Sequence, residues 1–215
     1  MTKLYVSNKD ESVRMFENSF LEAFSKVHWT VPLFIFIPVI FYLLYHSVMF
    51  NFSIGYILLL VLVGLFIWTL TEYSLHRWLF HFHPKTEAMQ KIFWTFHGVH
   101  HDYPQDSKRL VMPPSVSIPI STLFFFIFRA IVGSESVYPF FAGFMIGYLF
   151  YDITHYAIHH FNFIKGNIWK ELKDWHALHH YKYDNLGYGV SSPMWDYVFK
   201  TTYPEKDSSV EIHKT

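Results

Sequence analysis

Four apolar stretches constrain the fold of this chain more than any other feature. Residues 31–50 carry no charged side chain over 20 positions, and residues 54–71 are also free of charge. Residues 114–128 and 137–151 are apolar as well, before Asp152 interrupts the last stretch. A helix of about 20 apolar residues spans the hydrocarbon core of a bilayer, whereas core helices of soluble proteins rarely lack charge over such a length. The sequence therefore predicts four transmembrane helices.

The linkers and the basic residues order these stretches into two hairpins. Residues 47–53 join the first pair and residues 133–136 join the second. Of 17 Lys and Arg residues, all but Arg129 lie before the first stretch, between the hairpins, or after the last stretch. Cytoplasmic loops are enriched in Lys and Arg, so these three segments are expected on the cytoplasmic face. The membrane would be the endoplasmic reticulum in a eukaryote or the inner membrane in a bacterium.

The chain divides into an N-terminal amphipathic segment (1–30), a membrane-embedded domain (31–203) and a polar C-terminal tail (204–215). In the first segment, apolar residues recur at helical spacing beside charged ones: Val13, Phe16, Phe20, Phe24 and Val27. This pattern predicts an amphipathic helix. Such a helix either lies along the membrane surface or packs on the protein itself.

Histidine is the outlying residue type, with 15 copies, while Cys is absent. The 17 basic and 17 acidic side chains balance, which removes the electrostatic case for a nucleic-acid partner. The lack of Cys excludes disulfides, thiolate metal sites and Cys nucleophiles. Ten histidines form four groups on the predicted cytoplasmic side: His76 and His81; His97, His100 and His101; His155 and His159; His176, His179 and His180. A lone histidine is usually a packed residue, but four groups at matching places indicate metal ligands.

The spacings within these groups suit metal binding. Residues at i, i+3 and i+4 share a helix face, so each HxxHH triplet can converge on one point, as can His155 and His159. His76 and His81 lie five apart, so they need a helix end between them or serve different metals. One ion takes roughly four to six ligands, so ten imidazoles predict two ions.

The donor atoms narrow the choice of metal. All-nitrogen ligation suits zinc, iron or copper rather than magnesium or calcium. A closed structural zinc site would not draw ten ligands from four segments of the chain. Redox-active iron therefore fits a site at a membrane face better, although zinc is a possible occupant in purified protein.

Further residues next to these groups are candidates for supporting the ligands: Glu72, His83, Asp102, Asp152 and His160. A carboxylate can hold the far ring nitrogen of a ligand, and the alternative for each is an ion pair with Lys or Arg. His83 lies two residues after His81. His160 faces about 100° away from His159 on a helix, which favours His159 as the ligand.

These residues give the chain a resemblance to the fatty acid hydroxylase family, and within it to the fatty acid (ceramide fatty acyl) 2-hydroxylase branch. The resemblance covers about residues 64–203 and includes FIWTLTEYSLHRWLFH, HGVHHDYPQDSKRLVMPP, GYLFYDITHYAIHH, HALHHYKY and GYGVSSPMWDYVF. The order HX4H, HX2HH, HX3H, HX2HH is typical of that branch, and sterol desaturases, methyl-sterol oxidases and carotene hydroxylases share parts of it. The RLVMPP and WDYVF sequences favour the 2-hydroxylase.

The resemblance implies a diiron site held by those ten histidines, with dioxygen and two electrons as co-reactants. One oxygen atom would enter the C2–H bond of a long acyl chain, free or within a sphingolipid. The fold expected is all-α, with a cytoplasmic helical cap closing over the ends of the second and fourth spans. The Phe- and Tyr-rich spans would form an apolar slot that admits the chain from the bilayer.

Many relatives carry a fused cytochrome b5 domain at the N-terminus. Here about 30 residues precede the first span, and no HPGG heme motif occurs. Electrons are therefore expected from a separate carrier, such as cytochrome b5 or a ferredoxin.

Two alternatives remain open from the sequence. The first is the same hydroxylase or desaturase chemistry on another lipid, such as a sterol, a carotenoid or an alkylglycerol. The second is a metal-binding or metal-transporting membrane protein without catalysis. Transport favours ionisable residues along a path through the spans, and here Glu72 and Asp152 are nearly alone in that region.

Overall fold

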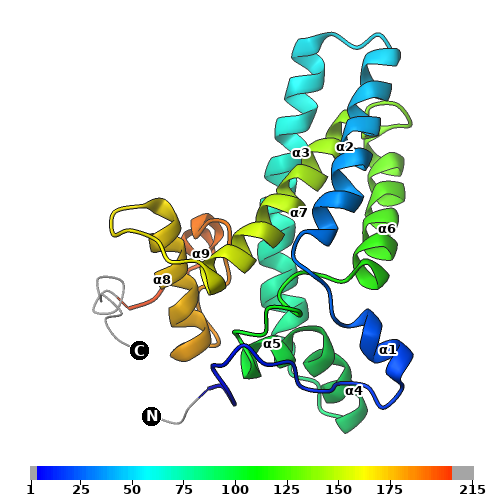
Figure 1. Ribbon diagram of the computed structural model, residues 1–215. Helices are drawn as coiled ribbons and strands as arrows, with labels where there is room; N and C mark the ends of the chain where they lie inside the picture. Colours follow the sequence, from blue (N-terminus) through cyan, green and yellow to red (C-terminus); the bar gives the residue numbers. More distant parts are fainter. Residues whose placement is uncertain (1–3, 205–215) are drawn as a thin grey trace.

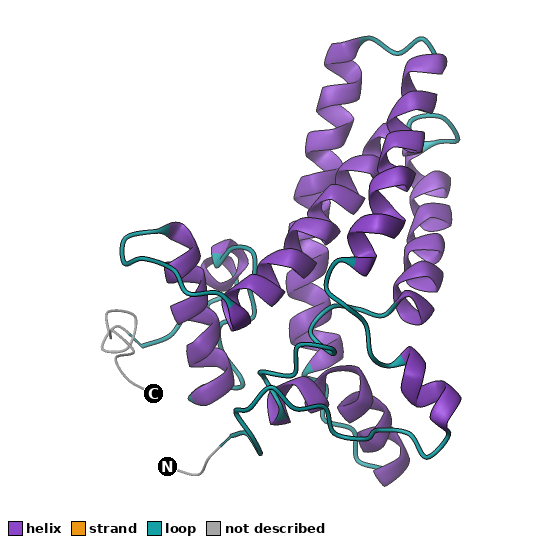
Figure 2. Ribbon diagram, viewed as in Figure 1, coloured by secondary structure: helices purple, strands orange, loops and turns teal. Residues whose placement is uncertain are grey.

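The computed structural model describes residues 4–204, and every regular element in that range is a helix (Figure 2). The long helices are α2 (Val31–Met49), α3 (Ile54–Ser74), α6 (Pro114–Val132) and α7 (Val137–His160). The short ones are α1 (Ser19–Phe24), α4 (Glu87–Phe93), α5 (Val99–Asp102), α8 (Ile168–Tyr181) and α9 (Met194–Val198), with π-helical turns η1 (Leu75–Phe80) and η2 (Trp94–Gly98). The all-α fold is confirmed; the expected polar tail lies, beyond residue 204, outside the described residues.

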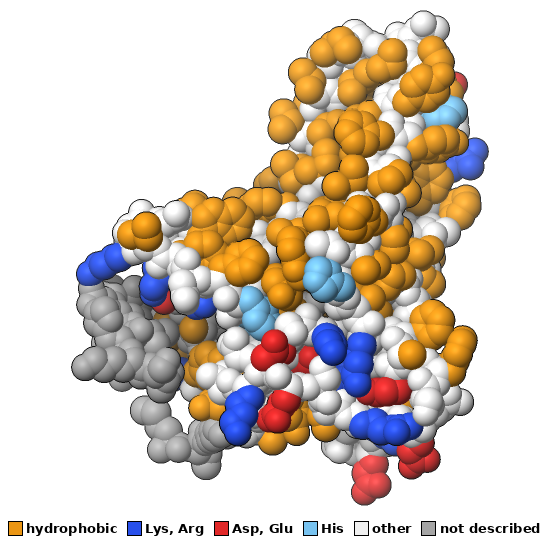
Figure 3. Space-filling model, viewed as in Figure 1, with side chains coloured by type: hydrophobic (Ala, Val, Ile, Leu, Met, Phe, Trp, Pro, Cys, Tyr) orange, Lys and Arg blue, Asp and Glu red, His pale blue; other side chains and the backbone are white. Residues whose placement is uncertain are grey.

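Within the described residues, three helices are long and apolar enough to cross a membrane: α2, α3 continued through η1, and α6. Apolar side chains cover the part of the surface where these helices lie, in the upper half of Figure 3. Helix α7 differs, because it carries Asp152 and three histidines and is buried along most of its length. The expected hairpins are present, but only three of the four expected spans have the composition of a membrane helix.

Helix α7 lies at the centre of the bundle and packs chiefly against α3, then against α2 (Figure 1). Glycines allow the close approach of α3 and α7. A Cβ atom added to Gly143 would lie 1.9 Å from the carbonyl oxygen of Val61, and one added to Gly64 would lie 1.9 Å from that of Phe140. Small residues of this kind bring helix backbones together in membrane proteins. The N-terminal half of α7 is thereby fixed against the middle of α3.

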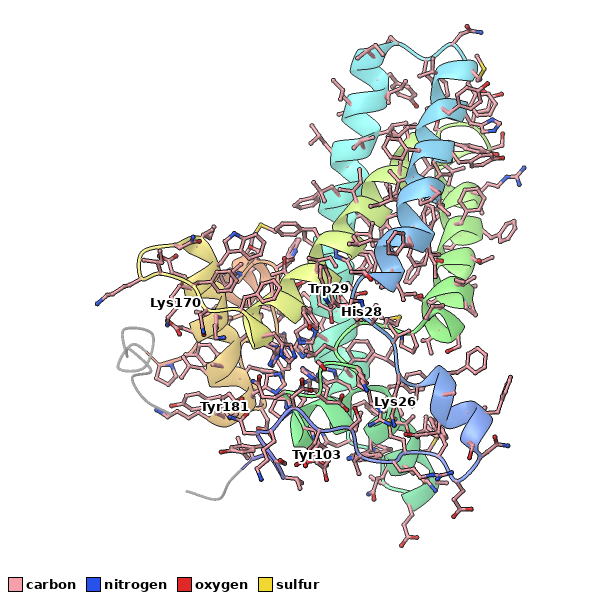
Figure 4. All side chains as sticks on the ribbon, viewed as in Figure 1. Lys26, His28, Trp29, Tyr103, Lys170 and Tyr181 are labelled. Carbon is pink, nitrogen blue, oxygen red and sulfur yellow. The ribbon has the colours of Figure 1, made fainter. Side chains whose placement is uncertain are left out.

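The remaining helices form a cap at one end of the bundle (Figure 1). In this view α4 and α5 lie below the bundle, and α8 and α9 lie to its left. The N-terminal segment runs across this cap. Its backbone N–H groups at Val6 and Ser7 donate to the carbonyl oxygen of Asp102, at 2.9 and 3.1 Å. The hydroxyl of Tyr181, labelled in Figure 4, donates to Oδ1 of Asn8 at 2.7 Å. The segment therefore ties α5 to α8.

The amphipathic helix expected across residues 13–27 is confined to α1. The Asn18 side chain caps its first turn by accepting from two backbone N–H groups, which starts the helix late. Upstream of α1, the backbone N–H of Phe16 donates to the carboxylate of Glu22 at 3.1 Å, and this contact requires a non-helical path between the two residues. Glu22 faces the protein while Phe20 is 69% exposed. Helix α1 thus packs on the protein and also presents an apolar surface.

Candidate metal centre

The ten histidines singled out from the sequence lie in two groups of five, and within each group one ring nitrogen of every histidine lies within 4.8 Å of those of the others. Cluster A consists of His76, His81, His97, His101 and His179; cluster B consists of His100, His155, His159, His176 and His180. The structure thus brings all ten together at the junction of the bundle and the cap.

Each HxxHH triplet is divided between the two clusters, so the expected convergence of each triplet on one point is wrong. His97 and His101 lie in cluster A while His100 lies in cluster B; conversely, His179 lies in cluster A and the other two members of its triplet lie in cluster B. Adjacent residues on a helix point about 100° apart, so neighbouring histidines face different ions when a helix lies between two sites. In each triplet the histidines at i and i+4 belong to the same cluster, and the histidine at i+3 belongs to the other cluster.

The pairs at the ends of the spans stay together. His155 and His159 lie on one face of α7 and both belong to cluster B, as the spacing predicted. His76 and His81 both belong to cluster A, because the turn η1 ends at Phe80. The backbone N–H of His81 closes this turn by donating to the carbonyl oxygen of His76 at 3.2 Å. The helix end that their spacing required is therefore present.

Separations between ring nitrogens show that the clusters suit metal ions. In cluster A, Nε2 of His97 lies 3.1 Å from Nε2 of both His76 and His101. In cluster B, the Nε2 atoms of His176 and His180 are 2.9 Å apart. Two nitrogens at about 2.1 Å from one ion would be about 3.0 Å apart at right angles and about 3.4 Å apart in a tetrahedron. The clusters fit an ion with five or more ligands better than a four-coordinate one.

Burial keeps these imidazoles neutral. Desolvation, and then the charge of neighbouring imidazoles, holds the pKa of His97, His100 and His101 well below the usual value. Burial lowers the pKa of His179 to about 4. Among the described residues, the Nε2 atoms of His100 and His159 are buried without a hydrogen-bond partner. Neutral imidazoles with free, buried nitrogens are the form that binds a metal.

Two backbone carbonyls orient rings of cluster A. Nδ1 of His76 lies 2.5 Å from the carbonyl oxygen of Tyr188, and Nδ1 of His179 lies 2.7 Å from that of Leu186. A carbonyl only accepts, so each Nδ1 carries the proton and each Nε2 is left free for an ion. These two contacts could not be predicted from the sequence, because any residue can supply a carbonyl.

Two buried carboxylates hold the loop that supplies these carbonyls. Glu72 accepts from the backbone N–H groups of Val190 and Ser191, at 2.9 and 2.8 Å, and from the Ser191 hydroxyl. Asp196 accepts from the N–H groups of Tyr188 and Gly189, both at 2.9 Å. Glu72 therefore supports His76 through the loop rather than by a direct bond to its ring, and Asp196 has a supporting role that the sequence analysis missed.

The other candidate supports also bond to groups other than ligand rings. Asp152 accepts from the Tyr148 hydroxyl at 3.1 Å and from the backbone N–H of Met112 at 3.3 Å. Asp102 accepts from Nε1 of Trp94 at 2.7 Å. These contacts join neighbouring helices and loops, so both residues act on the positions of the elements that carry the histidines.

His83 and His160 lie outside both clusters. His83 is exposed. The His160 ring stacks on the ring of Tyr156, with centroids 4.6 Å apart. The preference for His159 over His160 at the ion is thus consistent with the geometry.

A cavity of about 750 Å³ adjoins the clusters. Most of its wall is apolar. Residues of α1, η1, α4, η2, α5 and the start of α6 contribute to it, together with loop 109–113 and Tyr151, Asp152 and His155 of α7. The wall also includes His97 of cluster A and both His100 and His155 of cluster B. The cavity therefore reaches both clusters. More of its wall comes from the cap and its loops than from the spans, whereas the sequence predicted a slot between the spans.

Fold and site together define a helical protein of membrane type whose ten buried histidines can hold two metal ions beside an apolar cavity. A model of the fatty acid hydroxylase family matches residues 61–201. The chain therefore belongs to the fatty acid hydroxylase family, which confirms the resemblance seen in the sequence.

Individual relatives point to one branch. Over 192 residues the chain is 37% identical to the dihydroceramide fatty acyl 2-hydroxylase FAH1 of Arabidopsis thaliana, covering 89% of this chain and 80% of that protein. It is 37% identical over 216 residues to the fatty acid 2-hydroxylase of Rattus norvegicus, covering 90% of this chain and 58% of that protein. A solved structure of full-length scs7p, in which only the hydroxylase domain is visible, matches with a TM-score of 0.83 and 36% identity over 93% of this chain and 74% of that one.

Proposed function

We propose that this protein is a membrane monooxygenase that hydroxylates C2 of a long acyl chain, free or within a sphingolipid. The relatives named above are fatty acid or dihydroceramide fatty acyl 2-hydroxylases. The observation that carries the proposal is the apolar cavity of about 750 Å³ that meets histidines of both clusters. The overall reaction consumes one dioxygen, two electrons and two protons and releases one water with the hydroxylated chain.

Two iron ions are the proposed occupants of clusters A and B. The all-nitrogen donor sets and the nitrogen separations of 2.9–3.1 Å support an ion with five or more ligands. Such ions supply the activation of dioxygen, using electrons from a separate carrier such as cytochrome b5 or a ferredoxin.

The protein's own contribution is to position the chain and exclude water. The apolar side chains that α1, α4 and α6 contribute to the wall suit a hydrocarbon chain and disfavour water. Of the carbons in the chain, C2 must lie nearest the ions, so the carboxyl or amide end belongs beside His97, His100 and His155. Holding one C–H bond there in a fixed orientation accounts for the selectivity for one carbon.

The proposal includes a membrane arrangement. The end of α2 and the start of α3 lie at the opposite end of the bundle from the cap (Figure 1). Arg129, the one basic residue outside the three basic segments, lies in the last turn of α6, far from the start of that helix at the cap. This supports a cytoplasmic cap, with α7 as a fourth, protein-enclosed transmembrane helix.

The test is mass spectrometry of total hydrolysed fatty acids from cells that express the chain. A double variant, His100→Ala with His179→Ala, serves as the control, because it removes one proposed ligand from each cluster. A rise in 2-hydroxy acids with the wild type alone is expected. If no rise occurs although iron and an electron donor are present, the assignment to C2 of an acyl chain falls, and sterols and carotenoids become the substrates to assay.

A further inference from the structure

A second cavity, of about 350 Å³, reaches the metal centre from another side. Its wall includes His81, His97 and His101, which all belong to cluster A. Among the described residues that line it, no histidine comes from cluster B. The two clusters therefore differ in access: the larger cavity meets both, and the smaller one meets cluster A.

The smaller cavity has polar side chains in its wall. Gln90, Asp102 and Asp184 contribute amide and carboxylate groups, and exposed His83 lies beside them. The larger cavity is lined mainly by apolar side chains. Leu4, Phe82 and Trp94 also line the smaller cavity, so its wall is mixed, but it is more polar than the wall of the larger cavity.

An aromatic partition separates the two cavities. Phe80, Phe93 and His97 line both of them. The ring of Phe80 stacks on the ring of His97, with centroids 5.0 Å apart and an interplanar angle of 21°. These three side chains therefore form a wall that the two cavities share.

Burial of the ligands agrees with this asymmetry. All five histidines of cluster B are buried, whereas His81 and His101 of cluster A are partly exposed. Both partly exposed rings line the smaller cavity.

We propose that the smaller cavity is a water-side entrance to cluster A for small polar molecules, separate from the acyl cavity. This inference rests on the proposed function in one respect, namely that cluster A holds iron. It assigns the two ions different surroundings, one reached from water and the other enclosed by protein and acyl chain.

The test measures how fast azide, a small hydrophilic anion, binds to the iron-loaded protein, by stopped-flow absorbance of the azide–iron band. Gln90→Trp fills the cavity from its exposed helix α4 and is expected to slow azide association at least tenfold without changing the absorbance at saturation. Ile120→Trp, which fills the acyl cavity, is the matched control and is expected to leave the rate within about twofold of wild type.

A second variant acts through charge rather than bulk. Asp184 is an exposed carboxylate in the wall of the smaller cavity. Replacing it in Asp184→Asn removes a repulsive charge, so azide should associate about twofold faster at low salt, and the gain should vanish at high salt.

Iron content, measured beforehand, separates the two proposals. A protein that takes up no iron overturns the proposed function, and the entrance with it. Two ions bound per chain, with azide slowed by Ile120→Trp and not by Gln90→Trp, would overturn the entrance alone. Equal rates in wild type and Gln90→Trp would also overturn it, as would an unchanged low-salt rate in Asp184→Asn.

Discussion

Nδ1 of His76 lies 2.5 Å from the carbonyl oxygen of Tyr188, so a residue of η1, which continues α3, is oriented by a loop 112 positions further along the chain. The carboxylates of Glu72 and Asp196 fix that loop from two sides. The orientation of this ring in cluster A therefore depends on groups that belong to neither cluster.

Glu72→Gln tests this dependence. The amide keeps the size of the side chain but loses the charge, and its NH2 group faces backbone N–H donors. Groups that orient a ligand typically contribute about 10- to 100-fold to metal affinity, so cluster A should bind iron at least tenfold more weakly. Iron content by elemental analysis should fall from about two ions per chain towards one. Glu135→Gln, at an exposed site, is the control and should retain both ions.

Gly143→Ala should disturb the packing of α7 on α3. The added methyl group would lie 1.9 Å from the carbonyl oxygen of Val61, so the two backbones must separate. We expect a loss of about 1–3 kcal/mol in the free energy of unfolding, typical of overpacked sites. Thermal unfolding in detergent measures it. Gly55→Ala, with nothing within 4 Å of the new atom, should not destabilise the protein; equal effects of both variants would contradict the close approach.

Acid should weaken the contact between α1 and the cap through Glu22. Burial alone would raise the pKa of this carboxyl, but Lys26, two backbone N–H groups and Arg109 outweigh burial and lower it to about 2 from 4.5. Because the folded-state pKa is the lower one, the carboxylate stabilises the folded state fully above about pH 4.5. That stabilisation is lost as the pH falls through about 2.

The measurement is the difference in thermal midpoint between wild type and Glu22→Gln. It should be largest at pH 6–7 and shrink steadily below about pH 4.5. Both proteins lose the same metal ions in acid, so the difference isolates Glu22. Glu17→Gln, at an exposed carboxylate of the same segment, should unfold like wild type at pH 7. A difference that does not vary with pH would contradict the ionic contact.

Ile120→Trp should shorten the acyl chains that the enzyme accepts. Of the α6 residues in the wall of the larger cavity, Ile120 lies furthest along the helix from the cap. A larger side chain there occupies the space for the far end of a long chain and leaves the end near the histidines unchanged. Competition between long and short acyl substrates, analysed by mass spectrometry, should shift at least fivefold towards the shorter one. Ile118→Trp, at an exposed site on α6 outside the cavity wall, should leave the ratio unchanged.

The sequence was sufficient to single out the ten histidines that gather in the two clusters, because imidazole at helical spacing is a direct chemical signal. It did not predict which cluster each joins, since His100 and His179 face away from their own triplets only once both helices lie between the two sites. The only hint of the role of Asp196 in the sequence is weak: it is a carboxylate among the apolar residues of MWDYVF. The apolar stretch of α7 predicted a membrane span like the others, but α7 is buried against other helices. Gly143 and Gly147 are small residues of the kind that accompany such burial.

The exchange of His100 and His179 gives the ions a mechanical role. Cluster A joins His97 to His179 and cluster B joins His100 to His180, segments of the chain about 80 positions apart. An ion bound there acts as a cross-link that closes a long loop, which reduces the entropy of the unfolded chain as a disulfide would. Unlike a disulfide, such a link would need no cysteine and no oxidant, and it would open when a chelator removes the metal. The supply of the metal would then affect how much of the protein persists in the cell, in addition to how fast it works.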